Sequence, residues 1–111
     1  MTANRWAATS LACAAALGAL ACHAQGAGAP RVHVVTIEAM VFSPATLKVR
    51  RGDTVEWRNK DLVPHTATAA GAFDSGNLAP GKSWSRPMTT AGTQAYVCAY
   101  HPTMKGSLIV E

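Results

Sequence analysis

The sequence predicts an all-β fold, an antiparallel β-sandwich of seven or eight strands, and two observations support this prediction. From residue 31 onward, short runs rich in β-branched and aromatic residues alternate with clusters of Gly, Pro, Asn and Ser. No segment in that range keeps the 3.6-residue apolar period of an amphipathic helix. About 87 residues follow an apolar N-terminal segment, which is enough for one small domain with a modest core.

The first strands are predicted between residues 32 and 58. The run 32–37 is rich in β-branched residues, and 47–50 alternates apolar with charged side chains. After a turn that contains glycine, 54–58 alternates again, so Val55 and Trp57 are expected to face the core. We interpret 47–50 and 54–58 as the two strands of a hairpin.

The second half of the domain is predicted to hold shorter strands separated by loops. The candidate strands are 66–69, 82–86 with Trp84 facing inward, 94–98 and 107–110. Of the remaining large side chains, Met40 and Met88 are assigned to packing, although Met40 could instead lie near the rim of the functional site. His33, in the first strand, is assigned a structural or surface role.

Residues 1–24 are predicted to be a secretory signal peptide that is cleaved near residues 21–24. One positive residue, Arg5, precedes an uncharged run rich in Ala and Leu, which is too short for a membrane span. A cut just before Cys22, which would create a lipid anchor there, is the less expected alternative. The chain then divides into the signal peptide, a flexible leader over 25–30 and a folded domain over 31–111. This layout predicts a bacterial, periplasmic protein.

The charge pattern argues against nucleic-acid binding. Without Arg5, nine Lys and Arg residues stand against six Asp and Glu residues, a net charge of +3. Arg50 and Arg51 form the only adjacent basic pair, and no aromatic residue is interleaved with them. A mild positive charge instead favours acidic protein partners. We expect a monomer with no nucleic-acid partner and no membrane span.

Four side chains carry the functional prediction. Cys98 is the only thiol left once the signal is removed, in a compartment that favours disulfides. His101 and Met104 follow it within seven residues, and His65 lies on a separate loop stiffened by Pro64. Two imidazoles, a thiolate and a weak thioether suit copper that cycles between two oxidation states. A buried Cys acting as a small apolar side chain, or structural zinc, which rarely takes a thioether, are the alternatives.

The residues around these four resemble the cupredoxins, the small blue copper proteins. The ligand loop has the spacing Cys-x2-His-x2-Met, the short loop of the amicyanin-like branch, and Gly52-Asp53-Thr54-Val55-Glu56-Trp57 and Val63-Pro64-His65 also match. The resemblance implies a Greek-key sandwich and an apolar patch around a solvent-edge histidine, His101, that docks redox partners. It also implies that one type 1 copper is bound by His65, Cys98, His101 and Met104.

At one position near the site the chain departs from this pattern. Thr66 directly follows the first histidine, where many family members carry Asn and use its side chain to link the two ligand loops. A hydroxyl has a single donor and a shorter reach than an amide. The strength of the link between the loops is therefore the open question at this site.

The sequence thus predicts a periplasmic one-electron carrier that is not an enzyme. It would shuttle electrons between a dehydrogenase or cytochrome and an acceptor. The expected partners, which dock transiently, are a periplasmic dehydrogenase, a c-type cytochrome or a copper oxidase or reductase. The main alternative is a copper carrier or storage protein without redox turnover. A third possibility is a β-sandwich interaction domain in which the four side chains coincide by chance.

Overall fold

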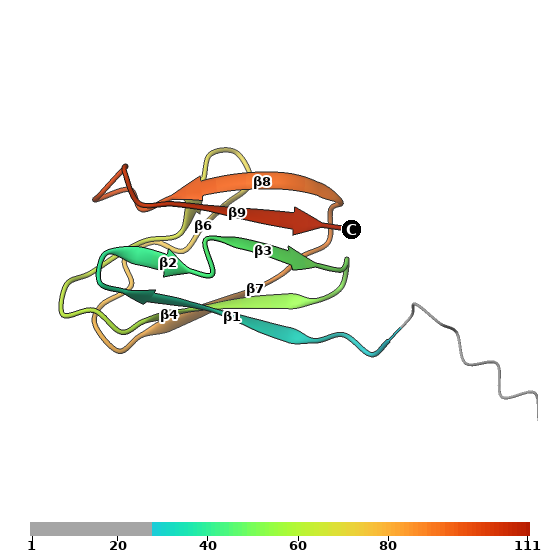
Figure 1. Cartoon of the computed structure of the whole chain (residues 1–111), viewed down its shortest axis with the longest axis horizontal. Helices are drawn as coiled ribbons and strands as arrows, with labels where there is room; N and C mark the ends of the chain where they lie inside the picture. Colours follow the sequence, from blue (N-terminus) through green and yellow to red (C-terminus); the bar gives the residue numbers. More distant parts are fainter. Residues whose placement is uncertain (1–27) are drawn as a thin grey trace, which may run out of the picture.

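The computed structural model describes residues 28–111, so the expected signal peptide and the first part of the leader lie outside the described residues. Two β-sheets pack face to face (Figure 1). One has the strand order β2-β1-β4-β7, and the other has β3-β9-β8-β5-β6. The strands are β1 Val32–Glu38, β2 Val41–Ser43, β3 Thr46–Val49, β4 Thr54–Asn59, β5 Thr68–Ala69, β6 Phe73–Asp74, β7 Ser83–Pro87, β8 Gly92–Val97 and β9 Lys105–Val110. In this part of the chain no helix is long and apolar enough to cross a membrane.

The predicted all-β sandwich is confirmed, with two differences in detail. The described part has nine strands rather than seven or eight. The sequence could not give the exact number, because β2, β5 and β6 are only two or three residues long and too short to show an alternating pattern. The sheets are also mixed, since β1 pairs parallel with β4 and β3 pairs parallel with β9. The other strand pairs are antiparallel.

The expected hairpin between 47–50 and 54–58 is wrong. Strand β3 pairs with β9 in one sheet, whereas β4 pairs with β1 and β7 in the other. The turn between them therefore crosses from sheet to sheet, with Gly52 at a φ of 93° that favours glycine. Alternation shows which face of a strand is buried but not which strand lies beside it, so it could not distinguish a hairpin from this crossing.

The core lies between the two sheets and contains a cluster of aromatic rings. Trp57, on β4, is fully buried and lies 5.4 Å from Phe73, 5.4 Å from Trp84 and 5.6 Å from Tyr96, measured between ring centroids. Burial raises the pKa of Tyr96 to about 12. The inward positions of Val55 and Trp57 are confirmed, and Trp84 packs against the core while partly exposed.

The two methionines assigned to packing behave differently. Met88 is buried in the core as expected, but Met40 is 41% exposed, so its assignment to packing is wrong. Met40 belongs to the turn between β1 and β2 rather than to a strand. Side chains alternate between core and solvent only within a strand, so this alternation does not direct the side chain of a turn residue into the core.

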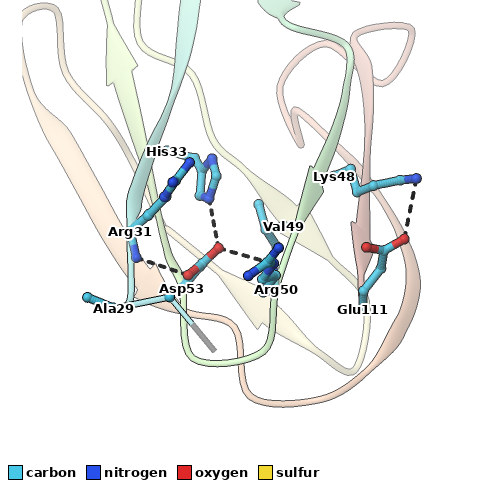
Figure 2. Close-up of a pocket in the computed structure, with 9 residues that line it drawn as sticks. Ala29, Arg31, His33, Lys48, Val49, Arg50, Asp53 and Glu111 are labelled. Atoms are coloured by element: carbon cyan, nitrogen blue, oxygen red, sulfur yellow. Dashed lines mark hydrogen bonds and ion pairs between the residues drawn. The ribbon is translucent and has the colours of Figure 1, made fainter. Parts of the chain in front are cut away.

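A buried carboxylate holds the end of the sandwich where the chain enters β1. Asp53 accepts hydrogen bonds from the backbone N–H groups of Arg31 (2.9 Å) and Arg50 (3.0 Å) and from Nε2 of His33 (2.9 Å), as Figure 2 shows. His33 therefore has the structural role that was expected. These bonds, led by the one from Arg31, lower the pKa of Asp53 from 3.8 to about 2. They join the start of β1 to the crossing between β3 and β4.

The Asp53 network predicts a loss of stability in acid. A carboxyl whose folded-state pKa is lowered stabilises the fold above its unfolded pKa of 3.8, and this contribution disappears as the pH falls toward about 2. Wild-type protein should be more resistant to urea than Asp53→Asn at neutral pH, and the difference should shrink between about pH 4 and pH 2. A difference that stays constant over that interval would contradict this assignment.

Gly106, in β9, lies directly against the ring of Tyr96, and a Cβ there would overlap ring atoms. Because Tyr96 is buried and cannot move aside, Gly106→Ala should lower the free energy of unfolding by about 1–3 kcal/mol. Ser107→Ala, the next position on the same strand, serves as the control and should have a much smaller effect. Equal denaturation midpoints for the two variants would show that the ring can yield.

Candidate metal centre

Three of the four predicted ligands lie on one tight loop between β8 and β9. The backbone closes this loop through His101 N–H to Cys98 O (3.2 Å), Met104 N–H to His101 O (2.8 Å) and Cys98 N–H to Met104 O (3.1 Å). Cys98 directly follows β8 rather than ending it. In Figure 1 the loop precedes β9 at the end of the sandwich opposite the C-terminus and the entry into β1. The Asp53 network therefore lies at the far end of the molecule.

The fourth predicted ligand, His65, lies on the segment between β4 and β5. Its backbone is paired with Leu78 in both directions, at 3.1 and 2.8 Å, and its side chain is completely buried. Pro64, just before it, limits the backbone further. The imidazole is therefore presented from a segment that is held on both sides.

The donor atoms of the two loops converge. Cys98 Sγ lies 3.7 Å from Nδ1 of His65 and 3.7 Å from Nδ1 of His101. In the described part of the chain these three form the single group of His, Cys, Asp or Glu side chains that could hold a metal ion, with all donor atoms within 4.8 Å of one another. Met104 is buried at the end of the same loop. The structure thus brings the predicted residues together.

The spacing fits a single ion bonded to all three atoms. Metal bonds of about 2.3 Å to a thiolate and about 2.0 Å to an imidazole, meeting at about 120°, place the sulfur and the nitrogen about 3.7 Å apart. This is the distance observed on both sides of Cys98. Zinc and copper share these bond lengths, so the thioether of Met104 and the single thiolate are what favour copper.

Solvent reaches the four residues unequally. His65 and Cys98 are fully buried and Met104 nearly so, whereas His101 is partly exposed. Several exposed apolar side chains lie next to the ligands in the chain: Leu62 (94% exposed), Val63, Tyr100 and Pro102. The hydroxyl of Tyr100 donates to Asn77 Oδ1 at 2.9 Å. His101 is thus the ligand closest to solvent, at an apolar surface.

Thr66 does link the two ligand loops. Its hydroxyl oxygen accepts from Ala99 N–H at 2.8 Å, and its own N–H donates to Cys98 Sγ at 3.4 Å. Thr68 donates to the carboxylate of Asp74, so the Thr66 hydroxyl must donate to Thr68 Oγ1, 2.9 Å away. The resulting chain of hydrogen bonds runs in one direction from the Ala99 amide to a carboxylate. Threonine therefore links the two loops, the role that the resemblance to the cupredoxins had assigned to an asparagine at this position.

Sequence reasoning missed Asp61, which contacts His65 on the side away from Cys98. Nε2 of His65 lies within hydrogen-bond distance of Asp61 Oδ2, at 2.7 Å. Burial opposes ionisation of this carboxyl, but hydrogen bonds from Met40, His65 and Ala39 outweigh it and lower its pKa. A carboxylate four residues before a ligand histidine was the available signal, since metal-bound histidines commonly donate their second nitrogen to such a group.

The sandwich and this donor set together define a small copper-binding β-sandwich domain. The chain belongs to the cupredoxin-like domain family, whose model matches residues 10–110. It is 33% identical over 84 residues to amicyanin from Paracoccus denitrificans, and the match covers 70% of this chain and 64% of that protein. It is 36% identical over 87 residues to plastocyanin from Scenedesmus fuscus, covering 66% of this chain and 89% of that protein.

Solved structures give the same result. A copper(I) form of an amicyanin variant superimposes with a TM-score of 0.70 at 31% identity, covering 77% of this chain and 87% of that chain. A copper-containing nitrite reductase from Thermus scotoductus superimposes with a TM-score of 0.67 at 27% identity, but the match covers 22% of that chain. The resemblance to the cupredoxins expected from the sequence is confirmed.

The Thr66 link predicts different effects for two substitutions. Thr66→Val keeps the shape but leaves the Ala99 N–H without its acceptor, so the free energy of unfolding of the metal-free protein should fall by about 1–3 kcal/mol. Thr66→Ser keeps the hydroxyl and should change little. Urea denaturation and hydrogen exchange of the Ala99 amide provide the measurement. Equal stability and equal exchange in the two variants would rule out the link.

Proposed function

We propose that this protein is an exported one-electron carrier with a single type 1 copper bound by His65, Cys98, His101 and Met104. The observation that supports it is the convergence of two Nδ1 atoms on one buried thiol at equal distances of 3.7 Å, with a buried thioether on the same loop. A mixed set of one thiolate, two imidazoles and one thioether suits both oxidation states of copper.

Each ligand would contribute differently. When bound, the copper supplies the one-electron couple, and the Cys98 thiolate gives its short, strongly covalent bond. His65 and His101 would act as neutral donors, and the Met104 thioether would be the weak donor that helps to tune the potential. The Thr66 N–H lies 3.4 Å from Cys98 Sγ and withdraws electron density from the sulfur. The buried surroundings exclude water from three of the four side chains.

The surroundings of the site also suit rapid electron transfer. The ligand loop is closed by three backbone hydrogen bonds, and the His65 segment is held by two. Donors that are fixed in this way move little when the copper changes oxidation state, which keeps the reorganisation barrier low. A carrier benefits from this more than a storage protein, which must open to release its metal.

The partly exposed His101 is the proposed exit for the electron. The exposed apolar side chains beside it, Leu62, Val63, Tyr100 and Pro102, would form the docking surface. Small surfaces of this kind suit short-lived redox encounters. The net charge of +3 would favour acidic partner surfaces, such as those of a dehydrogenase, a c-type cytochrome or a copper oxidase or reductase.

Four protein donors would leave no position on the copper for a substrate, which supports a carrier rather than an enzyme. The similarity to the nitrite reductase extends over only 22% of that chain. We place the carrier in the bacterial periplasm because residues 1–24 have the layout of a secretory signal, with 25–30 as a leader and 31–111 as the copper domain.

Absorption spectroscopy tests the proposed site. Copper(II)-loaded wild-type protein should show a strong band in the red part of the visible spectrum, because the thiolate donates charge to the metal, and the band should disappear on reduction. Cys98→Ser should lack the band, and His65→Gln should weaken or shift it. His33→Gln, which changes a histidine at the far end of the sandwich, is the matched control and should leave the band unchanged.

Two results would contradict the proposal. A protein that binds copper tightly but stays colourless would indicate storage without redox turnover. A protein that takes up no copper would instead support the third possibility, a β-sandwich interaction domain in which the four side chains lie together by chance.

A further inference from the structure

The turn between β1 and β2 has an unusual backbone. Its two residues, Ala39 and Met40, have φ values of 53° and 62°, in the left-handed region that residues other than glycine rarely adopt. Two consecutive residues in this conformation, neither of them glycine, indicate strain that the surrounding structure must hold in place.

The turn binds a carboxylate. The N–H of Ala39 donates to Asp61 Oδ1 at 2.6 Å, and the N–H of Met40 donates to Asp61 Oδ2 at 3.0 Å. Consecutive backbone N–H groups that point the same way form a concave binding site for an anion. Asp61 is also held from its own side, because its N–H donates to Asn59 Oδ1 at 2.9 Å. The carboxylate is thus fixed in position by two segments of the chain.

The same carboxylate contacts a buried ligand residue. Asp61 Oδ2 lies 2.7 Å from Nε2 of His65. An ionised carboxylate can only accept, so Nε2 must carry the hydrogen, and the neutral ring then has its lone pair on Nδ1. Nδ1 is the atom that faces Cys98 Sγ at 3.7 Å. The acceptor on one side of the ring therefore determines which nitrogen is available on the other.

We propose that the β1–β2 turn and Asp61 act as a positioning unit that fixes the tautomer and orientation of His65 before any metal binds. The left-handed φ values of Ala39 and Met40 are those that a two-residue hairpin turn requires, and in this turn they aim two N–H groups at the carboxylate. Asp61 is a positioning residue, since it acts on the metal only through His65. This inference deepens the proposed copper site and rests on it for one of the two measurements below.

Asp61→Asn breaks the unit in a defined way. The carboxylate accepts three hydrogen bonds through two oxygens, but an amide offers one oxygen, and its NH2 group would face a donor. Glu38→Gln is the matched control, because it removes the same charge beside the same turn and Glu38 is exposed. Both variants keep the residue volume almost unchanged.

The first measurement uses the metal-free protein. Nitrogen-15 NMR of the His65 ring should show the Nε2–H tautomer in the wild type and in Glu38→Gln, and a mixture or the Nδ1–H tautomer in Asp61→Asn. An Nδ1–H tautomer in the wild type would overturn the proposal, and this arm needs no variant to fold. Identical ring spectra for Asp61→Asn and Glu38→Gln would overturn it as well.

The second measurement is copper(II) affinity by competition with a chelator. Asp61→Asn should bind about 10- to 100-fold more weakly than the wild type, and Glu38→Gln should bind as the wild type does. Equal affinities for the two variants would contradict the positioning role while leaving the copper site intact. Absence of copper binding by the wild type would contradict the proposed function, and the tautomer measurement would still decide the role of Asp61.

Discussion

The contacts around the sulfur of Cys98 are what the site depends on. Cys98 and His65 lie 33 residues apart in the chain, and the Thr66 N–H reaches Sγ while the Thr66 hydroxyl holds the Ala99 N–H. Strands β5 and β8, which lead out of and into these loops, pair at Thr68 and Val97. The two ligand segments are therefore joined by backbone, hydroxyl and sulfur contacts before a metal is considered.

These contacts place the donors in a gradient of exposure that suits the proposed electron transfer. His65 is fully buried and hydrogen-bonded to Asp61, so it belongs to the rigid interior. His101 is partly exposed beside apolar side chains, so it can face a partner. One histidine thus stabilises the geometry and the other gives access. The aromatic core around Trp57 lies between the sheets and supports the strands that carry both loops.

The cluster of candidate ligands and the core faces could be predicted from the sequence, but the strand neighbours could not. Cys98, His101 and Met104 lie within seven residues, and this spacing brings them together in almost any fold. Alternation likewise identified Val55 and Trp57 as buried. Pairing of β3 with β9 depends on a turn that crosses between sheets, which alternation does not reveal. The proposed role of Asp61 depends on the left-handed backbone of Ala39 and Met40. Glycine usually marks that conformation in a sequence, and neither of these positions is a glycine.

The central claim is that one copper ion binds between the sulfur of Cys98 and the Nδ1 atoms of the two histidines. A crystal structure of the copper-loaded protein, with anomalous data collected on either side of the copper edge, tests it most directly. One strong anomalous peak is expected between Cys98 Sγ and the two Nδ1 atoms, with Met104 beside it. A peak elsewhere, for example at the His33–Asp53 pair, with none at Cys98 would contradict it.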